Sequence, residues 1–512
     1  MFGLIDKDKF KKIMIYTFIF GFIAHGYMYM NGDYTHDSLY GIVGITPIDE
    51  MNLSIGRFLI PLYLKVRGYV ASPLLIGVLI TLFVGISSYF IIDLLDIKNE
   101  LLKICVSAIL ITNYTITVTN ATYLNDSDPY CLSLLFAVLS IFCFKKLKKY
   151  WKLLGIPCLV MCIGLYQAYF QVALFLLMII AIKELLTQTN TKEIVKDNLI
   201  TLVYMFIGVV IYYIIYKLVL KVTGYDAGNL YNAIPDLSFY LDFERIISFF
   251  KYMITKEREW FVGKNNHHRR LILVINLIFV ALSVYSIAYV AIRNKISKGR
   301  KALIVVILLL MPLGMNVIGL LCDMYEHEVM TYSFFLAYAL VVMVFEIYQE
   351  NKGDKKVQKI IGSLSHKGIC LCFGILVLSN CIYSNEMYYE KHLVVQSTDM
   401  LMTRVIDRME QMDGYELGVT PVVFIGQPSQ SGYNYYRSGF LNTAEGTNVY
   451  TSISYYQTYE SYFKEYLGYP INLLDIGVSC DMGEIEEIIE MPCFPAKGSV
   501  AYYNDILVVK IA

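Results

Sequence analysis

The chain has 512 residues, of which 57% are hydrophobic and 17% charged, and its formal net charge at pH 7 is zero. A soluble domain is typically about 45–50% apolar and about 25% charged, so this composition excludes an ordinary soluble globular protein. The balanced charge gives no reason to expect a nucleic-acid partner. Repeated apolar runs of roughly 18–24 residues, each long enough for a ~30 Å hydrocarbon core, indicate an α-helical polytopic membrane protein.

The apolar runs predict about eleven transmembrane helices. In chain order they cover residues 13–30, 72–92, 101–118, 131–144, 153–165, 168–182, 199–222, 271–292, 302–321, 329–348 and 367–384. The first run is too long for the apolar core of a cleavable signal peptide, so we expect it to stay in the membrane. The runs at 153–165 and 168–182 are short, and we expect a hairpin between them at Tyr166-Gln167, because one long helix would break the alternation of the loops.

Short basic segments set the predicted orientation. They read DKDKFKK, IKNELLK, KKLKKYWK, KELLTQTNTKEIVK, RNKISKGRK and QENKGDKKVQK. All of them fall on one side if the spans alternate, and the positive-inside rule makes that side the cytoplasm. We therefore predict a multi-pass protein of the cytoplasmic membrane, with a cytoplasmic N-terminus and an extracytoplasmic C-terminal part.

The composition changes near residue 385. Residues 386–412 carry apolar side chains at helical spacing, and residues 418–426 have the pattern of a buried strand. The apolar segments on either side of Asn504-Asp505 predict a terminal hairpin. We predict two domains, a transmembrane domain over residues 1–384 and a small extracytoplasmic α/β domain over residues 385–512.

The polar loop between the first two predicted spans, residues 31–57, carries the strongest indication of function. It places Asp33, His36 and Asp37 just past a hydrophobic helix, where carboxylates are costly to dehydrate and usually have a task or a partner. Asp33 and Asp37 are four positions apart and would share one face of a short helix. We expect a general base here, with Asp37 as the first candidate, Asp33 as the second and His36 beside them in the substrate site; the alternative is a solvated loop cap.

Arg57 closes this loop and opens the amphipathic stretch RFLIPLYLKVRGYV, which we expect to lie in the outer interface rather than to span. The planar guanidinium of Arg57 suits a phosphate group. Snorkelling toward lipid headgroups explains the same residue equally well.

Asp126 and Asp128 form a D-x-D triplet at the mouth of a span, in the second outer loop. Such carboxylates ligate Mg²⁺ or Mn²⁺ in many proteins. Asp128-Pro129 also suits a helix N-cap followed by proline. A divalent cation at Asp126 and Asp128 is therefore one of two open alternatives.

Further polar residues lie near the outer ends of later spans. Tyr166 and Gln167 can bind a sugar hydroxyl or hold helices together, and the second role is the commoner one. His268 and Arg269 stand immediately outside a span, where they can receive a lipid phosphate or serve as interfacial anchors.

In this order the motifs resemble a known family. They are D-x-x-x-D at Asp33 and Asp37, G-R at Gly56 and Arg57, the acidic loop at Asn125, Asp126 and Asp128, L-Y-Q at Leu165 to Gln167, and V-F-I-G at Val423 to Gly426. The chain resembles the bacterial glucosyltransferase II-type membrane proteins, which are related to O-antigen glucosyltransferases.

The resemblance implies a GT-C-type fold and a polyprenyl-phosphate-linked hexose donor, with glucose as the first choice. It implies transfer to a glycan acceptor outside the cytoplasmic membrane, with a carboxylate of the first outer loop as base, which carries over to Asp37 or Asp33. Many relatives in the wider class use a divalent ion, and membrane lipids surround the site.

Three other functions compete with this one. A glycolipid flippase or other transporter would place ionisable residues near the bilayer midplane, whereas here they crowd at the outer face. A glycan polymerase usually has one large outer loop rather than an α/β tail. A non-catalytic scaffold would use the tail as its binding module and would tolerate Asp37→Asn.

Overall fold

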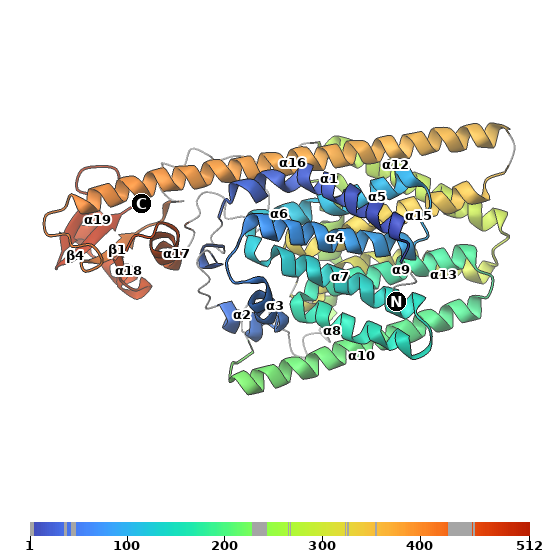
Figure 1. Cartoon of the computed structure of the whole chain (residues 1–512), viewed down its shortest axis with the longest axis horizontal. Helices are drawn as coiled ribbons and strands as arrows, with labels where there is room; N and C mark the ends of the chain where they lie inside the picture. Colours follow the sequence, from blue (N-terminus) through green and yellow to red (C-terminus); the bar gives the residue numbers. More distant parts are fainter. Residues whose placement is uncertain are drawn as a thin grey trace.

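The computed structural model describes residues 5–34, 38–41, 48–227, 243–264, 266, 268–322, 324, 327–353, 356–428, 453 and 456–512. Figure 1 shows a bundle of long helices with a small sheet domain beyond one end of it, and helix α16 running along the bundle into that domain. We call the part of the chain after residue 410 the tail, and the end of the bundle nearest to it the tail end.

Ten helical segments of the described chain are long and apolar enough to cross a membrane. The bundle contains α1 (Lys7–Asn31), α4 (Pro73–Leu94), α5 (Glu100–Thr112), α6 (Tyr114–Thr122), α7 (Leu124–Lys146), α8 (Gly155–Leu165), α9 (Phe170–Thr187), α10 (Thr191–Thr223), α12 (Arg269–Arg293), α13 (Lys298–Asn316), α15 (Leu336–Asn351) and α16 (Lys356–Glu410). The predicted polytopic helical membrane protein is therefore confirmed.

Shorter elements cap or interrupt the bundle. They are η2 (Ser38–Gly41), α2 (Ile48–Ser54), α3 (Leu59–Arg67), η3 (Lys149–Leu154), η4 (Gln167–Tyr169), α11 (Phe243–Val262), α14 (Ile318–Leu321) and η6 (Glu328–Phe335). The amphipathic stretch after Arg57 forms α3, which is far too short to cross a bilayer and buries Ile60 and Leu64 while it exposes Val66.

Local sequence signals explain where the helices begin and end. Asp6 caps α1, because its side chain accepts hydrogen bonds from the backbone N–H groups of Asp8 and Lys9. The helix ends at Gly32, whose φ of +67° is a left-handed conformation that glycine adopts without strain. Asn113 separates α5 from α6 and caps the second helix through the N–H of Ile116.

The predicted hairpin at Tyr166 is confirmed. Tyr166 has an extended backbone (φ −157°, ψ 108°) between α8 and η4, so no single helix runs through this region. Lys145, at the end of α7, forms ion pairs with Glu184 near the end of α9 and with Asp197 near the start of α10. Helices α7 and α9 therefore run in the same direction, and α8, at half the length of a span, brings the chain back between them.

The basic segments gather at the end of the bundle away from the tail, as predicted. Ion pairs tie them together there, namely Lys9–Asp93, Lys98–Glu350, Lys145–Glu184 and Lys183–Asp96. Arg300 at the start of α13 donates to the backbone carbonyl of Leu185 at the same end. That this end faces the cytoplasm stays a prediction.

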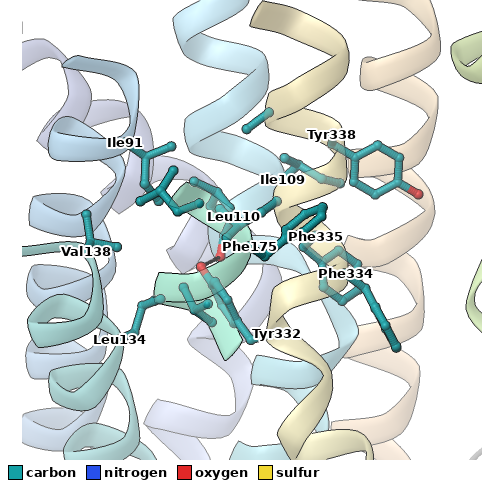
Figure 2. Close-up of a cluster of buried hydrophobic side chains, with 14 of the residues drawn as sticks. Ile91, Ile109, Leu110, Leu134, Val138, Phe175, Tyr332, Phe334, Phe335 and Tyr338 are labelled. Atoms are coloured by element: carbon teal, nitrogen blue, oxygen red, sulfur yellow. Dashed lines mark hydrogen bonds between the residues drawn. The ribbon is translucent and has the colours of Figure 1, made fainter. Parts of the chain in front are cut away.

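A tightly packed apolar core holds the bundle together. Figure 2 shows one part of it, where Ile91, Leu110, Val138, Phe175, Phe334 and Phe335 come together from several helices. Tyr332 of η6 is buried in this cluster, and its hydroxyl donates to the carbonyl of Leu110 at 2.7 Å. This bond satisfies a polar group that would otherwise be costly to bury.

The tail contains a four-stranded sheet in the order β2-β1-β4-β3. Its strands are β1 (Pro421–Ile425), β2 (Asn472–Leu473), β3 (Val500–Tyr503) and β4 (Ile506–Lys510), and the central pair β1–β4 is parallel. Strands β3 and β4 form an antiparallel hairpin whose turn, Asn504-Asp505, has positive φ at both residues. The predicted strand at 418–426 and the terminal hairpin are confirmed.

Short helices pack beside the sheet, namely α17 (Tyr456–Ser461), the π-helical segment η9 (Tyr462–Tyr466), α18 (Ile476–Gly483) and α19 (Glu486–Glu490). The predicted division at residue 385 falls inside α16, which continues without interruption from the bundle to Glu410. Two residues of the first loop, Tyr34 and Leu39, belong to the buried hydrophobic cluster of the tail. The tail core is thus built from both ends of the sequence.

Candidate active site

Asp33 lies directly after the C-cap of α1 and is almost completely buried, with 3% of its surface exposed. One carboxylate oxygen, Oδ1, lies 2.8 Å from Nδ1 of His392. The other, Oδ2, is buried and has no hydrogen-bond partner within the described part of the chain. Burial raises the pKa of this carboxyl from its ordinary value, against the hydrogen bond from His392, which lowers it. A free buried oxygen with raised proton affinity is suited to a general base.

His392 comes from α16, 359 positions away in the sequence. Its other ring nitrogen lies 2.9 Å from the side chain of Gln396, and its ring meets Tyr27 edge-on. One weak signal for this residue is visible in the sequence, a lone histidine just beyond the last predicted span. Its pairing with Asp33 depends on α16 lying beside α1, which no local pattern reveals.

His36 and Asp37 lie outside the described residues. The first-ranked base, Asp37, and its neighbour in the predicted substrate site therefore stay predictions.

Arg57 occupies the short connection between α2 and α3 and is buried, with 8% exposed. Its Nη1 donates to the hydroxyl of Tyr130 at 2.9 Å. Its guanidinium carbon lies 4.8 Å from the ring centre of Tyr166, and the rings of Tyr130 and Tyr166 stack at 3.8 Å. A cation held against two aromatic faces has lost much of its hydration, so its charge is strongly felt by any anion that reaches it. The packed position argues against snorkelling.

Hydrogen bonds from other helices fix the turn that carries Arg57. Gly56 has a φ of +85°, and a Cβ added there would meet the Tyr212 hydroxyl at 2.3 Å. Tyr212 donates to the Gly56 carbonyl at 3.1 Å, and Gln167 donates to the Ile55 carbonyl at 2.6 Å. Gln167 thus links the break between α8 and α9 to the first loop. Of the two roles considered for Gln167, binding a sugar hydroxyl or holding helices together, this contact corresponds to the second.

A largely apolar cavity of about 370 Å³ begins at Arg57. Its polar lining consists of Arg57, Tyr166, Gln167 and Tyr212 with Tyr213. Apolar and sulfur-containing residues make up the remaining wall, namely Ile163, Ala168, Phe170, Val209, Val317, Ile318, Leu320, Cys322 and Met330. One cationic group at the edge of an apolar cavity matches a ligand with an anionic head and a hydrocarbon chain.

The structure pairs Asp128 with Arg67, which lies in the amphipathic stretch and was not among the predicted site residues. Arg67 Nη1 lies 2.6 Å from Asp128 Oδ1, and the Tyr63 hydroxyl donates to Asp128 Oδ2 at 2.6 Å. The two charged side chains are 1% and 0% exposed. Element η2 of the first loop contacts α7, so the loop lies beside the helix that carries Asp128.

These contacts bear on the divalent cation considered at Asp126 and Asp128. Both oxygens of Asp128 are engaged by protein donors, whereas Asp126 Oδ1 is buried and has no hydrogen-bond partner among the described residues. Among the described residues no three His, Cys, Asp or Glu side chains come together as ligands. This donor set does not fit a resident divalent ion.

His268 and Arg269 lie at the start of α12, in another part of the bundle. His268 Nδ1 is 3.0 Å from the hydroxyl of Ser379 in α16, and Arg269 is exposed. Within the described chain, no contact joins either residue to Asp33 or Arg57. A role in binding the donor stays a prediction for both.

The fold and this site define a multi-pass helical membrane protein that holds a carboxylate and an arginine in its first loop, the arginine at the edge of an apolar cavity. The chain matches the family model described as Glucosyl transferase GtrII over residues 26–345, more than half of its length, and it belongs to that family. No curated protein and no solved structure shows a significant match. The resemblance inferred from the motifs is thereby confirmed.

Membership makes the protein a membrane glycosyltransferase, which uses a sugar donor and a glycan acceptor. The matched range includes Asp33, Arg57 and Asp128 and ends before α16. His392 and the tail therefore lie outside it.

Proposed function

We propose that the protein transfers a hexose, with glucose as the first choice, from a polyprenyl-phosphate donor to a cell-surface glycan on the outer face of the cytoplasmic membrane. The observation that carries the proposal is the apolar cavity with Arg57 at its edge. A nucleotide sugar offers no hydrocarbon to such a cavity, whereas a polyprenyl phosphate offers both a chain and an anion. The GT-C-type fold implied by the resemblance is part of the proposal.

In the proposed reaction an acceptor hydroxyl attacks the anomeric carbon of the donor hexose. A bond forms between the acceptor oxygen and that carbon, and the bond from the carbon to the phosphate oxygen breaks. A sugar hydroxyl is a weak acid, so a carboxylate of the first loop, Asp33 or Asp37, takes its proton during the attack. Inversion at the anomeric carbon is expected from the resemblance.

The leaving group is the polyprenyl phosphate, which departs with the electron pair and gains negative charge. Arg57 stabilises this charge, since its guanidinium is held by Tyr130 and Tyr166 before the reaction and need not reorganise. The hydrocarbon chain occupies the cavity between α8, α9, α10 and α14, and so keeps the phosphate at the tail end.

The test is transfer of radiolabelled glucose by the purified protein in proteoliposomes, with polyprenyl-phosphate-glucose and a nucleotide-glucose compared as donors. We expect label in the glycan only from the lipid-linked donor. Arg57→Met should abolish most of the transfer, and Arg258→Met, at an exposed arginine of α11, serves as its matched control.

Transfer from the nucleotide sugar alone would contradict the proposed donor. Movement of the labelled lipid across the bilayer without any transfer would favour a flippase, and joining of preassembled glycan units would favour a polymerase.

A further inference from the structure

The first loop and the tail meet at Asp399, a residue of α16. Its Oδ1 accepts hydrogen bonds from the hydroxyls of Tyr34 and Tyr462, each at 2.7 Å, and its Oδ2 accepts one from Tyr466 at 3.0 Å. Tyr34 belongs to the first loop, whereas Tyr462 and Tyr466 belong to η9 of the tail. One carboxylate thus joins three parts of the chain that are far apart in sequence.

Ring packing strengthens this junction. The ring centre of Tyr34 lies 4.1 Å from that of Tyr466 and 5.9 Å from that of Tyr462. Tyr34 is 3% exposed, and Leu39, further along the same loop, is fully buried in the tail cluster. Without the first loop the tail core would lose two of its buried side chains.

Helix α16 holds the loop at two neighbouring points. His392 and Asp399 are seven positions apart, which places them on the same face of the helix about 10 Å apart along its axis. His392 contacts Asp33, and Asp399 contacts Tyr34, the next residue in the chain. Any shift of Tyr34 relative to α16 therefore moves the backbone of Asp33 as well.

We propose that Asp399, Tyr34, Tyr462 and Tyr466 form a clamp through which the tail fixes the first loop and positions Asp33 for the transfer reaction. The clamp residues other than Tyr34 lie beyond the matched family range of residues 26–345. Asp399 is a positioning residue, since it acts through the loop. The catalytic half of the proposal rests on the proposed function.

The chemistry of the clamp suits a permanent tether. Burial raises the pKa values of the Tyr34, Tyr462 and Tyr466 hydroxyls well above that of free tyrosine, and the nearby Asp399 carboxylate adds to the effect. All three hydroxyls therefore keep their protons throughout the physiological range and remain donors.

The experiment compares the full-length wild type with Asp399→Asn and Tyr34→Phe in nanodiscs. Tyr415→Phe is the matched control, because it removes a half-buried hydrogen bond between two tyrosines of the tail, Tyr415 and Tyr469 at 2.9 Å, that does not involve the first loop. Two properties are measured: the amide hydrogen exchange of peptides covering residues 32–41, and the kinetics of hexose transfer, as kcat and KM.

We expect Asp399→Asn to speed exchange in this segment and to lower kcat between about tenfold and a hundredfold, with a donor KM close to that of the wild type. Tyr34→Phe should show a smaller effect of the same kind, since it keeps the ring and loses one hydroxyl. Tyr415→Phe should leave both quantities near the wild-type values.

Unchanged exchange in both clamp variants would overturn the proposal, and so would faster exchange with unchanged kcat. An equal loss in Tyr415→Phe would also overturn it, by showing a general loss of tail stability. A wild type without transfer but with faster exchange in Asp399→Asn would contradict the proposed function and still support the clamp.

Discussion

The buried pair of Arg67 and Asp128 gives the sharpest prediction about stability. Arg67 donates to Asp128 Oδ1 at 2.6 Å, to the Asn125 carbonyl at 2.8 Å and to Asn125 Oδ1 at 2.5 Å. Arg67→Met would leave the Asp128 carboxylate buried without its cationic partner, while the Tyr63 hydroxyl still donates to it. Breaking one side of a buried ion pair costs about 3–5 kcal/mol, so we expect the free energy of unfolding to fall by that amount.

The double variant Arg67→Met with Asp128→Leu should cost less than either single change. It removes both charges, and the remaining loss is that of the donor to the two Asn125 acceptors and of the acceptor for the Tyr63 hydroxyl, about 1–3 kcal/mol in all. The assay is equilibrium unfolding of the purified protein in detergent, followed for the wild type, both single variants and the double variant.

A double variant that loses the sum of the single losses, about 6–10 kcal/mol, would refute the account of a mutually compensating pair. Transfer activity provides a second reading of the same proteins. If the pair of Arg67 and Asp128 has a structural role alone, the double variant should keep measurable turnover per folded molecule. The opposite result would be a double variant that folds but is inactive, together with wild-type activity that depends on added Mg²⁺ or Mn²⁺. It would support the metal site considered for Asp126 and Asp128.

Three further predictions concern the first loop. His392→Leu should move the acidic limb of the pH profile of kcat/KM to higher pH, because it removes the hydrogen bond that lowers the pKa of Asp33. His392→Asn can keep a donor near the position of Nδ1 and should bring the limb back toward its wild-type pH. An acidic limb that does not move in His392→Leu would exclude Asp33 as the titrating base. Arg57→Lys should keep part of the transfer activity that Arg57→Met loses, since lysine retains the positive charge but lacks the planar guanidinium. Equal activity in the two variants would argue against phosphate binding by Arg57. Gly56→Ala should lower the midpoint of thermal unfolding, because the new Cβ would meet the Tyr212 hydroxyl at 2.3 Å. Adding Tyr212→Phe removes that hydroxyl and should restore part of the midpoint. An unchanged midpoint in Gly56→Ala alone would contradict this contact.

The acidic limb depends on every group that faces Asp33. Lys391 and His392 of α16 lower the pKa of its carboxyl, whereas Asp399 of the same helix raises it. Tyr27 of α1 and Tyr466 of the tail also interact electrostatically with Asp33. Because burial is the largest influence and raises the pKa, the base is charged above this raised pKa, and activity should fall as the pH drops through it.

Much of the fold could be predicted because its signals are local. Apolar runs of membrane length mark the spans, and the break at Tyr166 follows from two runs that are each too short. The pattern of Lys and Arg predicted which ends of the helices lie together, and Asn504-Asp505 marked the hairpin of the tail. Each of these signals lies within a few tens of residues.

The sequence failed where long-range packing decides. The sequence predicts helix on both sides of residue 385, but the change in composition there does not show that the apolar span and the polar segment form one continuous helix, α16. The pairing of His392 with Asp33 depends on two helices more than three hundred residues apart lying side by side. Arg67 was visible in the amphipathic stretch, but only the folded structure shows it turned inward onto Asp128.

The most direct test of the central claim is glucose transfer from radiolabelled polyprenyl-phosphate-glucose in proteoliposomes that contain the wild type, Asp33→Asn or Asp37→Asn. We expect the wild type to label the glycan, and one of the two variants, although folded and inserted, to lose nearly all transfer and so reveal the base. Full activity in both variants would contradict a carboxylate base in the first loop. The absence of transfer from any lipid-linked hexose by the wild type, with the donor accessible at the outer face, would contradict the proposed reaction.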